Sequence, residues 1–592
     1  MSFMQHSAAK EIQLHDVQQR WPDWQARLFD LTHLPFSFPE SFLCISTLAH
    51  NQVWLRSVRG GDERNDDGKL FHLQLLNLAG EELDFSSYLS PDSLRLQHDD
   101  AHADICFVDG DTLLIRLHNA GLRLNMQAQS YDYVQTLNDA IHVSNARQDL
   151  SVRIQQKNTR LTLDAPWQGQ KAERIRLEFY AEAATSNTET ESSLCLHVYR
   201  ILPKREVHKD YPDFHHAQEQ ARHSFQTWLQ ASLASAATWR HGRFLAAYIT
   251  WSCLVPAVGQ LSAPAMYMSK NWMVNIWSWD HCFNALALGR QQAERAWQQM
   301  KILFDHQHTS GRLPDFVNDQ YAYWRFTKPP VHGWTFAQLR RMAPEFYTND
   351  RCRQVLQWLS LQAHSWLDHG LHGLPVYDHG NDAGWDNSTV FLKGTPLHSP
   401  DLITFLILQC EEIAALHAHL QEDELASVWH EKAQQLHSKL IDELWRDGRF
   451  QARHAISQEY VDVGHSLIAF MPLLLGERLP QAIRQQLLHD LKAPQRFITA
   501  HGLATEACDS AYYHADGYWR GPIWAPVMAL MCDALCRCDE HALAEQLAHG
   551  FLNMAQHTGM AENFEAQSGQ GLRDRAFTWT SSVFLLLAHQ YS

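Results

Sequence analysis

Two short loops of the chain each carry two carboxylates at close spacing. The first, "HGNDAGWDNSTVF", holds Asp382 and Asp386, and the second, "GMAENFEAQSGQG", holds Glu562 and Glu565. Both loops are too rich in Gly, Asn and Asp to form stable helices. A carboxylic acid that donates a proton and a carboxylate that activates a water can together hydrolyse a glycosidic bond. Within each pair the alternative role is to cap a helix or to hold a turn, and composition does not choose between the members.

Tryptophans gather in several further loops, beside charged and polar side chains. An aromatic face stacks on the C–H face of a pyranose ring, and charged groups hydrogen-bond its hydroxyls, so the pattern predicts a sugar pocket. The alternative is that these are core tryptophans, which fits any single one of them better than five loops together. The candidate residues are Trp277, Trp279, Asp280, Lys328, His332, Trp385, Tyr518, Trp519 and Arg520. Arg520 has two candidate roles, binding sugar hydroxyls or bracing the loops.

The remaining sequence indicates which elements position these loops. From about residue 36 to 202, short segments alternate apolar and polar residues between turn residues, which predicts antiparallel strands of a β-sandwich. From about residue 240, helical patterns dominate without a regular repeat, so we expect a closed toroid of helical hairpins whose long loops form the site. The expected helices are 240–256, 281–306, 333–342, 350–368, 400–420, 422–446, 466–475, 480–492, 523–537, 539–557 and 577–590.

These patterns predict a multidomain protein of α and β structure. We expect an N-terminal β-sandwich domain at 1–205, a linker helix at 206–239 and a catalytic domain at 240–592. The length of 592 residues provides enough apolar material for such large cores.

Composition indicates which classes of partner are disfavoured and which cellular compartment is expected. The formal net charge of −17 argues against nucleic acid or an anionic membrane as the main partner. No run of 18 uncharged apolar residues appears, so no membrane span is expected. The 11 cysteines are scattered, and the N-terminus lacks the charged and then apolar pattern of a secretory signal. We therefore expect a reduced, cytoplasmic protein.

Signals for a metal or a nucleotide cofactor are weak. His369, His372 and His379 fit a metal site only in part, and no zinc-protease "HExxH" arrangement occurs. No Gly-rich phosphate loop of P-loop or Rossmann type occurs either. We predict no metal site and no cofactor, with a Ca²⁺ held by loop carboxylates as the open alternative.

Five motifs, in order, resemble glycoside hydrolase family 63 and its relatives, which include processing α-glucosidase I and the mannosylglycerate and glucosylglycerate hydrolases. The motifs are "WSWDHCFNALAL", "TKPPVHGW", "GWDNS", "YWRGPIW" and "ENFEAQSGQG…FTWTSS", within about residues 240–592. The resemblance implies an (α/α)6 barrel, often behind an N-terminal β-sandwich, and hydrolysis of an α-glycosidic bond with inversion. It implies that Asp386 is the general acid, which must hold a proton, and that Glu562 is the general base, which stays ionised.

The same resemblance implies which residues line the sugar pocket. They are Trp277, Asp280, Gly384, Tyr518 and Trp519. Two departures from the family pattern bear on substrate specificity. In the loop that carries Asp386, family members often have Glu-Ser before the Gly, where this chain has Asp382 and Ala383. Before the Pro-Pro motif they often have Gln, where this chain has Lys328.

Three functional hypotheses follow. The first is an inverting α-glucosidase that acts on a small α-glucoside, such as a disaccharide or a glucosylglycerate-like compound. The second is a trehalase-like enzyme or an α-mannosidase that acts on mannosylglycerate. The third is a non-catalytic carbohydrate-binding protein, which is disfavoured because both candidate carboxylates are present. An anionic aglycone would need a nearby cation, for which Lys328 and Arg520 are the candidates; the sequence indicates neither the aglycone nor the oligomeric state.

Overall fold

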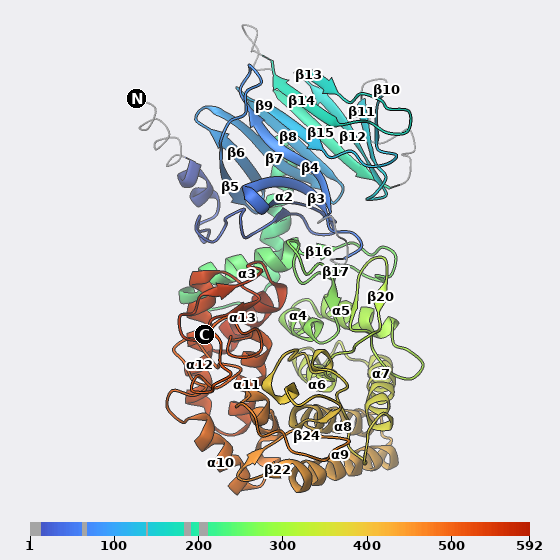
Figure 1. Ribbon diagram of the computed structural model, residues 1–592, viewed down its shortest axis with the longest axis vertical. Coiled ribbons are helices and arrows are strands. Elements are labelled where there is room, and N and C mark those ends of the chain that lie inside the picture. The colour runs from blue at the N-terminus through green and yellow to red at the C-terminus, as the bar shows by residue number, and fades with distance from the viewer. Residues whose placement is uncertain (1–12, 62–67, 138–139, 183–190, 201–210) are drawn as a thin grey trace. The chain divides into compact units, whose positions relative to one another are not determined.

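The computed structural model describes residues 13–61, 68–137, 140–182, 191–200 and 211–592 (Figure 1). The chain divides into two compact units. The sandwich unit comprises the described residues up to Gln230 together with residues 247–256 and 269–274, and the helical unit comprises residues 231–246, 257–268 and 275–592.

The sandwich unit contains two antiparallel sheets. Its strands are β1 (Phe36–Ser37), β2 (Leu43–Leu48), β3 (Gln52–Ser57), β4 (Lys69–Leu76), β5 (Ser86–Ser90), β6 (Ser93–His98), β7 (Ala101–Asp109), β8 (Thr112–His118), β9 (Gly121–Met126), β10 (Tyr133–Leu137), β11 (Ala140–Asn145), β12 (Leu150–Lys157), β13 (Thr159–Asp164), β14 (Ile175–Ala181), β15 (Ser192–Tyr199) and β16 (Leu254–Val255). One sheet has the order β1-β2-β3-β4-β9-β14-β13 and the other the order β10-β11-β12-β15-β8-β7-β6-β5.

Alternation along the strands explains why these segments form sheets with one buried face. In β12, Leu150, Val152 and Ile154 are buried, and the residues between them are partly exposed. Because successive side chains of a strand point to opposite faces, this pattern covers one face of the sheet and leaves the other accessible. The predicted antiparallel, sandwich-like region at the N-terminal end is therefore confirmed.

Helix α2 (Phe214–Ala231) lies within the segment predicted as a linker helix, whose residues 206–210 are outside the described part of the chain. Its first turn packs on the sandwich unit, where Phe214 and Ala217 join a buried cluster with Cys106, Leu114 and Cys195. The helix therefore has an apolar face that is covered by the eight-stranded sheet.

The helical unit is built from helices and a few short ladders. Its main helical segments are α3 (Arg240–Ser252, which begins here), α4 (Asp280–Leu288), α5 (Ala293–Asp305), α6 (His332–Met342), α7 (Asn349–Asp368), α8 (Pro400–His419), α9 (Asp423–Leu444), η5 (Leu467–Arg478), α10 (Gln481–Leu491), α11 (Ala525–Arg537), α12 (His541–Thr558) and α13 (Thr578–Gln590). The ladders are made by β17 (Ala265–Met266), β18 (Ile276–Trp277), β19 (Phe316–Val317), β20 (Ala322–Tyr323), β21 (Leu397–His398), β22 (Trp445–Arg446), β23 (Arg449–Phe450), β24 (Arg453–His454), β25 (Asn563–Phe564) and β26 (Gly571–Leu572).

Six of these segments contact one another in a closed series. α4 contacts α6, and the contacts continue through α8, η5, α11 and α13 back to α4. α4, α8 and α13 are buried along nearly their whole length, whereas α5, α7, α9, α10 and α12 bury one face. Helices that are apolar all round lie in an interior, and amphipathic helices cover it.

Two expected helices differ from the structure. The single helix predicted over 281–306 is the pair α4 and α5, because the backbone leaves the helical conformation between them, with Gln292 at a φ of −129° and a ψ of 47°. The helix predicted over 466–475 is the segment η5, a 3-10 turn segment with Pro472 inside it and Gly476 at a φ of 58°.

Helix α8 is the one described helix whose length and apolar composition would suffice for a membrane span. Of its most apolar window, 72% is buried inside the structure, as is typical of a core helix.

Candidate active site

The acid loop, residues 380–391, is pressed against an aromatic wall. It begins as a 3-10 turn (Gly380–Ala383) and ends that turn at Gly384, whose φ is 69°. A Cβ on Gly384 would lie 2.7 Å from two ring carbons of Trp279. Both the left-handed backbone and this contact require glycine, so Gly384 fixes how closely the loop approaches the wall.

The two carboxylates of the acid loop have different surroundings. Asp382 is 3% exposed, and its Oδ1 accepts a hydrogen bond of 3.0 Å from the backbone N–H of Thr327. Asp386 is half-buried, and its carboxylate forms no hydrogen bond or ion pair with the described residues. Asp382 therefore holds a neighbouring loop, while the carboxylate of Asp386 is left for a ligand.

A clamp around Asn387 fixes Asp386 from the side of the "YWRGPIW" loop. The Asn387 amide donates to the Gly517 carbonyl at 3.0 Å and accepts from the backbone N–H of Trp519 at 2.9 Å. The Arg520 guanidinium donates to the Asn387 carbonyl at 2.6 Å. Of the two roles considered for Arg520, the structure shows a bracing hydrogen bond to the acid loop.

The two glutamates of the C-terminal loop also differ. Glu565 accepts hydrogen bonds from the Tyr513 hydroxyl at 2.8 Å and from the backbone N–H groups of Gln567 and Ser568 at 3.0 and 2.5 Å. Burial alone would raise the pKa of Glu565, but these hydrogen bonds hold it below its ordinary value. Glu562 is 4% exposed, and its carboxylate has no hydrogen-bond partner or counter-ion within bonding distance among the described residues. Glu565 therefore shapes the loop, and the Glu562 carboxylate is free.

Short ladders position Glu562. Its backbone N–H donates to the Asp574 carbonyl at 2.7 Å, and its own carbonyl accepts from Trp579 Nε1 at 3.3 Å. Directly after it, β25 pairs with β26 in an antiparallel hairpin. The side chain of Glu562 therefore projects from a backbone that is held on both sides.

The carboxylates of Glu562, Asp280 and Asp386 are close enough to act on one another electrostatically. Burial raises the pKa of Glu562 to about 8, and the negative charges of Asp574, Asp386 and Asp280 add to the increase against the opposing charge of Arg573. Burial likewise raises the pKa of Asp280 to about 8, with Lys328 opposing and Asp315 and Asp386 contributing. The resemblance implies an ionised Glu562; its burial among other carboxylates instead favours the protonated form below about pH 8.

Lys328 is buried in an ion pair. Its Nζ lies 3.1 Å from Asp315 Oδ1 and donates to the Asn381 carbonyl at 3.0 Å and to the Asn381 side-chain oxygen. Burial alone would lower the pKa of Lys328, but the charges of Asp315, Asp386 and Asp280 raise it. Lys328 is therefore a charged partner of the site carboxylates, with its own ion pair already formed.

A cluster of tryptophans forms the wall behind the carboxylates. Trp519 stacks on Trp524 with ring centroids 3.9 Å apart, and lies 5.0 Å from Trp385 and 6.2 Å from Trp279. Trp279, Trp385 and Trp519 are at most 2% exposed, so they have a core role as well as any contact with a ligand. Trp277 is half-buried and packs on Phe316 at 5.4 Å.

Several buried polar atoms of this site have no hydrogen-bond partner among the described residues. They are Ser278 Oγ, Asp280 Oδ2, Trp519 Nε1 and Asn563 Nδ2. A buried polar atom without a partner carries a desolvation cost, which the hydroxyls of a sugar would remove. The donors and acceptors present therefore suit a polyhydroxylated ligand.

His332 lies behind the site. One ring nitrogen is 2.9 Å from the Ser278 carbonyl and the other is 3.0 Å from Gln362 Nε2. Burial lowers the pKa of His332 to about 4, so the ring is neutral at neutral pH. The structure thus shows His332 supporting the Trp277–Asp280 segment, with both ring nitrogens engaged.

Tyr518 and Arg573 complete the side of the site near Glu562. Tyr518 has a φ of 63°, and burial together with the charges of Asp386 and Glu562 raises the pKa of its hydroxyl. The Arg573 guanidinium lies 4.9 Å from the Tyr518 ring centroid and 2.8 Å from Asp516. The sequence motifs did not indicate Arg573; the only available signal was its position 11 residues after Glu562 (573 − 562), on the far side of the β25–β26 hairpin.

Within the described part of the chain, no group of three or more His, Cys, Asp or Glu side chains is arranged to hold a metal ion.

Two carboxylates without a hydrogen bond or ion pair, an aromatic wall and buried polar atoms without partners are features that a glycoside hydrolase needs to bind and cleave a sugar. Comparison with known proteins supports this class: residues 273–580 match the mannosylglycerate hydrolase MGH1-like glycoside hydrolase domain. The match covers 308 of 592 residues (580 − 273 + 1), so the chain belongs to this family, within glycoside hydrolase family 63. The resemblance found in the sequence is confirmed.

Individual relatives are distant. The chain is 24% identical to a mannosylglycerate hydrolase of Thermus thermophilus over 395 residues, which is 52% of this chain and 93% of that protein. The mannosylglycerate hydrolase of Rubrobacter radiotolerans is 22% identical over 403 residues, or 52% of this chain and 89% of the relative. Among solved structures, a bacterial glucoamylase complexed with acarbose has a TM-score of 0.61 at 10% identity and covers 96% of this chain and 94% of its own. That likeness concerns the fold alone.

Proposed function

We propose that this glycoside hydrolase cleaves the α-glucosidic bond of a small α-glucoside with inversion, with Asp386 as general acid and Glu562 as general base. The observation that carries the proposal is that these two carboxylates, from loops 176 residues apart (562 − 386), act electrostatically on each other and form no hydrogen bond or ion pair with the described residues. The neighbouring acids Asp382 and Glu565, in contrast, hold backbone N–H groups.

In this mechanism Asp386 protonates the oxygen of the leaving group while Glu562 removes a proton from the attacking water. Inverting enzymes place the two carboxyl groups about 6.5 to 9.5 Å apart so that a water fits between Glu562 and the anomeric carbon. Asp280 Oδ2 accepts a hydrogen bond from a sugar hydroxyl, and Tyr518 and Trp277 contact the sugar ring. The clamp of Asn387 and Arg520 fixes the direction of the Asp386 carboxyl.

The pair must hold one proton between its two members. Because the ligand-free site raises the pKa of Glu562 to about 8, the reactive arrangement with an ionised Glu562 is a minor form at neutral pH. The opposite assignment, with Glu562 as the acid and Asp386 as the base, is the alternative that an experiment must exclude.

A second substrate is favoured by the comparisons, because the relatives named above are mannosylglycerate hydrolases. Glycerate is an anion, and the two cations that act on the site carboxylates, Lys328 and Arg573, already pair with Asp315 and Asp516. These ion pairs favour a neutral aglycone, so we place the α-glucoside first and mannosylglycerate second.

The proposed catalytic domain begins near residue 240, after the sandwich (1–205) and the linker helix (206–239), and the proposed location of the enzyme is the cytoplasm. We propose that α4, α6, α8, η5, α11 and α13 form the inner ring of an (α/α)6 barrel. The closed series of contacts and the likeness in fold to the glucoamylase support this architecture.

A substrate panel tests the proposed function. Purified protein is incubated with α-linked glucose disaccharides, trehalose, glucosylglycerate and mannosylglycerate, and ¹H NMR follows the first product. We expect hydrolysis of a small α-glucoside with initial release of the β-anomer. Initial release of the α-anomer contradicts inversion, cleavage of mannosylglycerate alone establishes the second substrate, and binding without cleavage of any compound supports a carbohydrate-binding protein.

A further inference from the structure

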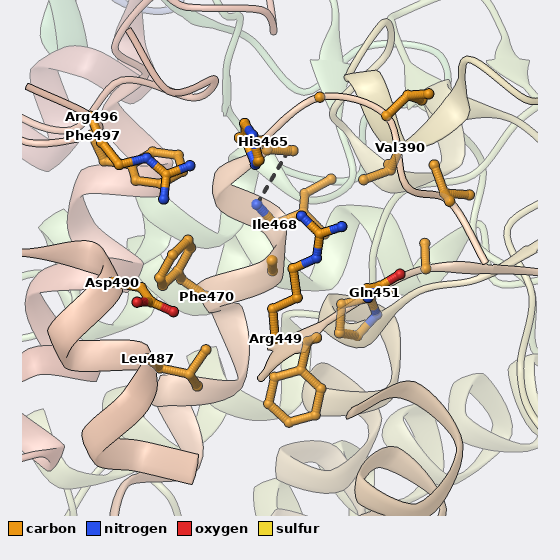
Figure 2. Close-up of a pocket in the computed structure, with 18 residues that line it drawn as sticks. Val390, Arg449, Gln451, His465, Ile468, Phe470, Leu487, Asp490, Arg496 and Phe497 are labelled. Atoms are coloured by element: carbon orange, nitrogen blue, oxygen red, sulfur yellow. Dashed lines mark hydrogen bonds between the residues drawn. The ribbon is translucent and has the colours of Figure 1, made fainter. Parts of the chain in front are cut away.

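The helical unit contains a cavity whose lining residues do not include the site carboxylates (Figure 2). Its volume is about 120 Å³, and its floor is apolar, with Phe450, Ile468, Phe470, Leu487 and Phe497. Neither Asp386 nor Glu562 lines it. The floor comes from β23, η5, α10 and the segment that follows α10, whereas the lining residue His465 is exposed, so the cavity has an apolar floor and a solvent-accessible rim.

Two guanidinium groups face this apolar floor. Arg449 and Arg496 line the cavity together with His465 and one acidic side chain, Asp490. The Arg449 guanidinium forms no hydrogen bond or ion pair with the described residues, whereas Arg496 lies 3.4 Å from Asp509. In Figure 2, Arg449 reaches toward Ile468 and His465, and Asp490 lies across the cavity near Phe470.

The charges of both arginines act on His465, which also lines the cavity. Burial lowers the pKa of His465, and the charges of Arg496 and Arg449 lower it further, against Glu506 and Asp509. A site at which two guanidinium groups disfavour a third positive charge is one where an anion is stabilised.

One wall of the cavity is bonded directly to the acid loop. Val390, the cavity residue contributed by that loop, follows Ser388 and Thr389. Ser388 Oγ lies 2.9 Å from Ser466 Oγ, and a Cβ on Gly464 would lie 2.4 Å from the Thr389 side chain. The cavity wall 464–466 and the loop that carries Asp386 are therefore in close contact.

Glu506 ties the same two segments together. Its fully buried carboxylate accepts hydrogen bonds from Thr389 Oγ1 at 2.8 Å, from the backbone N–H of His465 at 2.6 Å and from Ser510 Oγ at 2.5 Å. Glu506 therefore joins His465 directly to Thr389, which lies three residues after Asp386.

We propose that this cavity binds a small organic carboxylate with an apolar body, and that its occupancy alters catalysis through the acid loop. The carboxylate pairs with Arg449 and Arg496, and the apolar body covers the phenylalanine and leucine floor. The volume corresponds to a ligand on the order of ten non-hydrogen atoms. The occupant is a metabolite-sized aliphatic or aromatic acid; a sugar phosphate lacks the apolar surface that the floor would bury. The proposal adds a regulatory site to the proposed function and does not depend on the identity of the sugar.

The binding test uses 3-phenylpropionate as the probe and isothermal titration calorimetry as the readout. We expect saturable binding to the whole protein, a loss of about tenfold or more in affinity for Arg449→Met, and little change for Arg446→Met. Arg446 is a matched control because it lies on the paired strand β22 and its guanidinium donates to the carbonyls of Trp445 and Asp442, outside the cavity lining. The neutral analogue 3-phenylpropan-1-ol should bind at least about tenfold more weakly than the acid. Equal affinity of the Arg449→Met variant, equal affinity of the alcohol, or no saturable binding each overturns the proposed site.

The coupling test measures hydrolysis of whichever substrate the panel identifies, with and without the probe. We expect the probe to change kcat in the wild type, and to have no effect in Arg449→Met at concentrations that saturate the wild type. Competition with the substrate, seen as a change in KM alone, would place the probe in the active site and overturn the coupling. A protein that binds the probe at Arg449 but cleaves no glycoside refutes the proposed function and leaves the anion site standing.

Discussion

Replacing Glu562 by Gln should make the protein more stable at alkaline pH, although it removes a candidate catalytic group. The pKa of the Glu562 carboxyl is raised from 4.5 to about 8 in the folded protein, chiefly by burial. A carboxyl whose folded pKa is raised contributes stability below its unfolded pKa, and this stability is lost as the pH rises through the folded pKa. The window is therefore about pH 4.5 to about 8.

The magnitude follows from the same values. Each pH unit between 4.5 and about 8 corresponds to about 1.4 kcal/mol, so an isolated Glu562 would destabilise the folded state by up to about 5 kcal/mol when ionised. Asp280 and Asp386 share this repulsion, since each acts on the other carboxyls, so we expect the measured gain to be about 2 to 5 kcal/mol.

The assay is urea unfolding of wild type and Glu562→Gln at about pH 5 and about pH 9, with the difference in unfolding free energy compared between the two. We expect a small difference at the acid end and a clear gain for the variant at the alkaline end. If the difference between variant and wild type is the same at both pH values, the argument that burial keeps this carboxyl protonated is refuted.

Glu565 provides a matched control with the opposite sign. Hydrogen bonds from Tyr513 and two backbone N–H groups hold its pKa below the ordinary value, so its ionised form stabilises the fold above that value. Glu565→Gln should therefore lower the unfolding free energy by a similar amount, about 1 to 3 kcal/mol, at both ends of the range. An alkaline gain in this variant as well would show that the effect is general and not specific to Glu562.

Two further changes test the acid loop. Gly384→Ala should lower the unfolding free energy by about 2 to 5 kcal/mol and lower kcat/KM, because the new Cβ collides with Trp279 and the backbone is left-handed. Gly394→Ala is the control, because φ is 93° there and nothing lies within 4 Å of the new Cβ. It should lower the unfolding free energy by the backbone cost alone, about 1 kcal/mol. If both alanine variants lower the thermal stability equally, the contact with Trp279 does not explain the effect of Gly384→Ala. Asn387→Ala should reduce kcat/KM about 10- to 100-fold, because it removes the amide that holds the backbone of Trp519 and thereby fixes the direction of Asp386. Steady-state kinetics within about twofold of wild type would show that this clamp does not position the acid.

The sequence predicted the classes of element well because their signals are local. Period-two alternation in segments such as β12 and apolar content in α8 report burial of each element by itself. The break between α4 and α5 was missed although Gly289, which ends α4, is a residue type that often ends helices. The 3-10 segment η5 was likewise read as an ordinary helix despite Pro472.

At the candidate site, composition alone did not separate Asp386 from Asp382 or Glu562 from Glu565, and the family resemblance implied the choice of Asp386 and Glu562. The separation depends on which carboxylate accepts a backbone hydrogen bond, and this follows only from the folded positions of Thr327 and of the loop after Glu565. The support roles of Asn387, Arg573 and Glu506 were also missed, because each acts between segments far apart in the chain.

The roles of the two carboxylates can be tested most directly with an activated substrate, the α-glycosyl fluoride of the sugar that the enzyme accepts. Fluoride leaves without protonation, so a variant without its general acid keeps this reaction, whereas a variant without its general base loses it. We expect Asp386→Asn to release the β-anomer from the fluoride at a rate within about tenfold of wild type, and Glu562→Gln to be slowed by about 100-fold or more, both followed by ¹H NMR. The reverse pattern, with Glu562→Gln active on the fluoride and Asp386→Asn inactive, would contradict the assignment of Asp386 as acid and Glu562 as base.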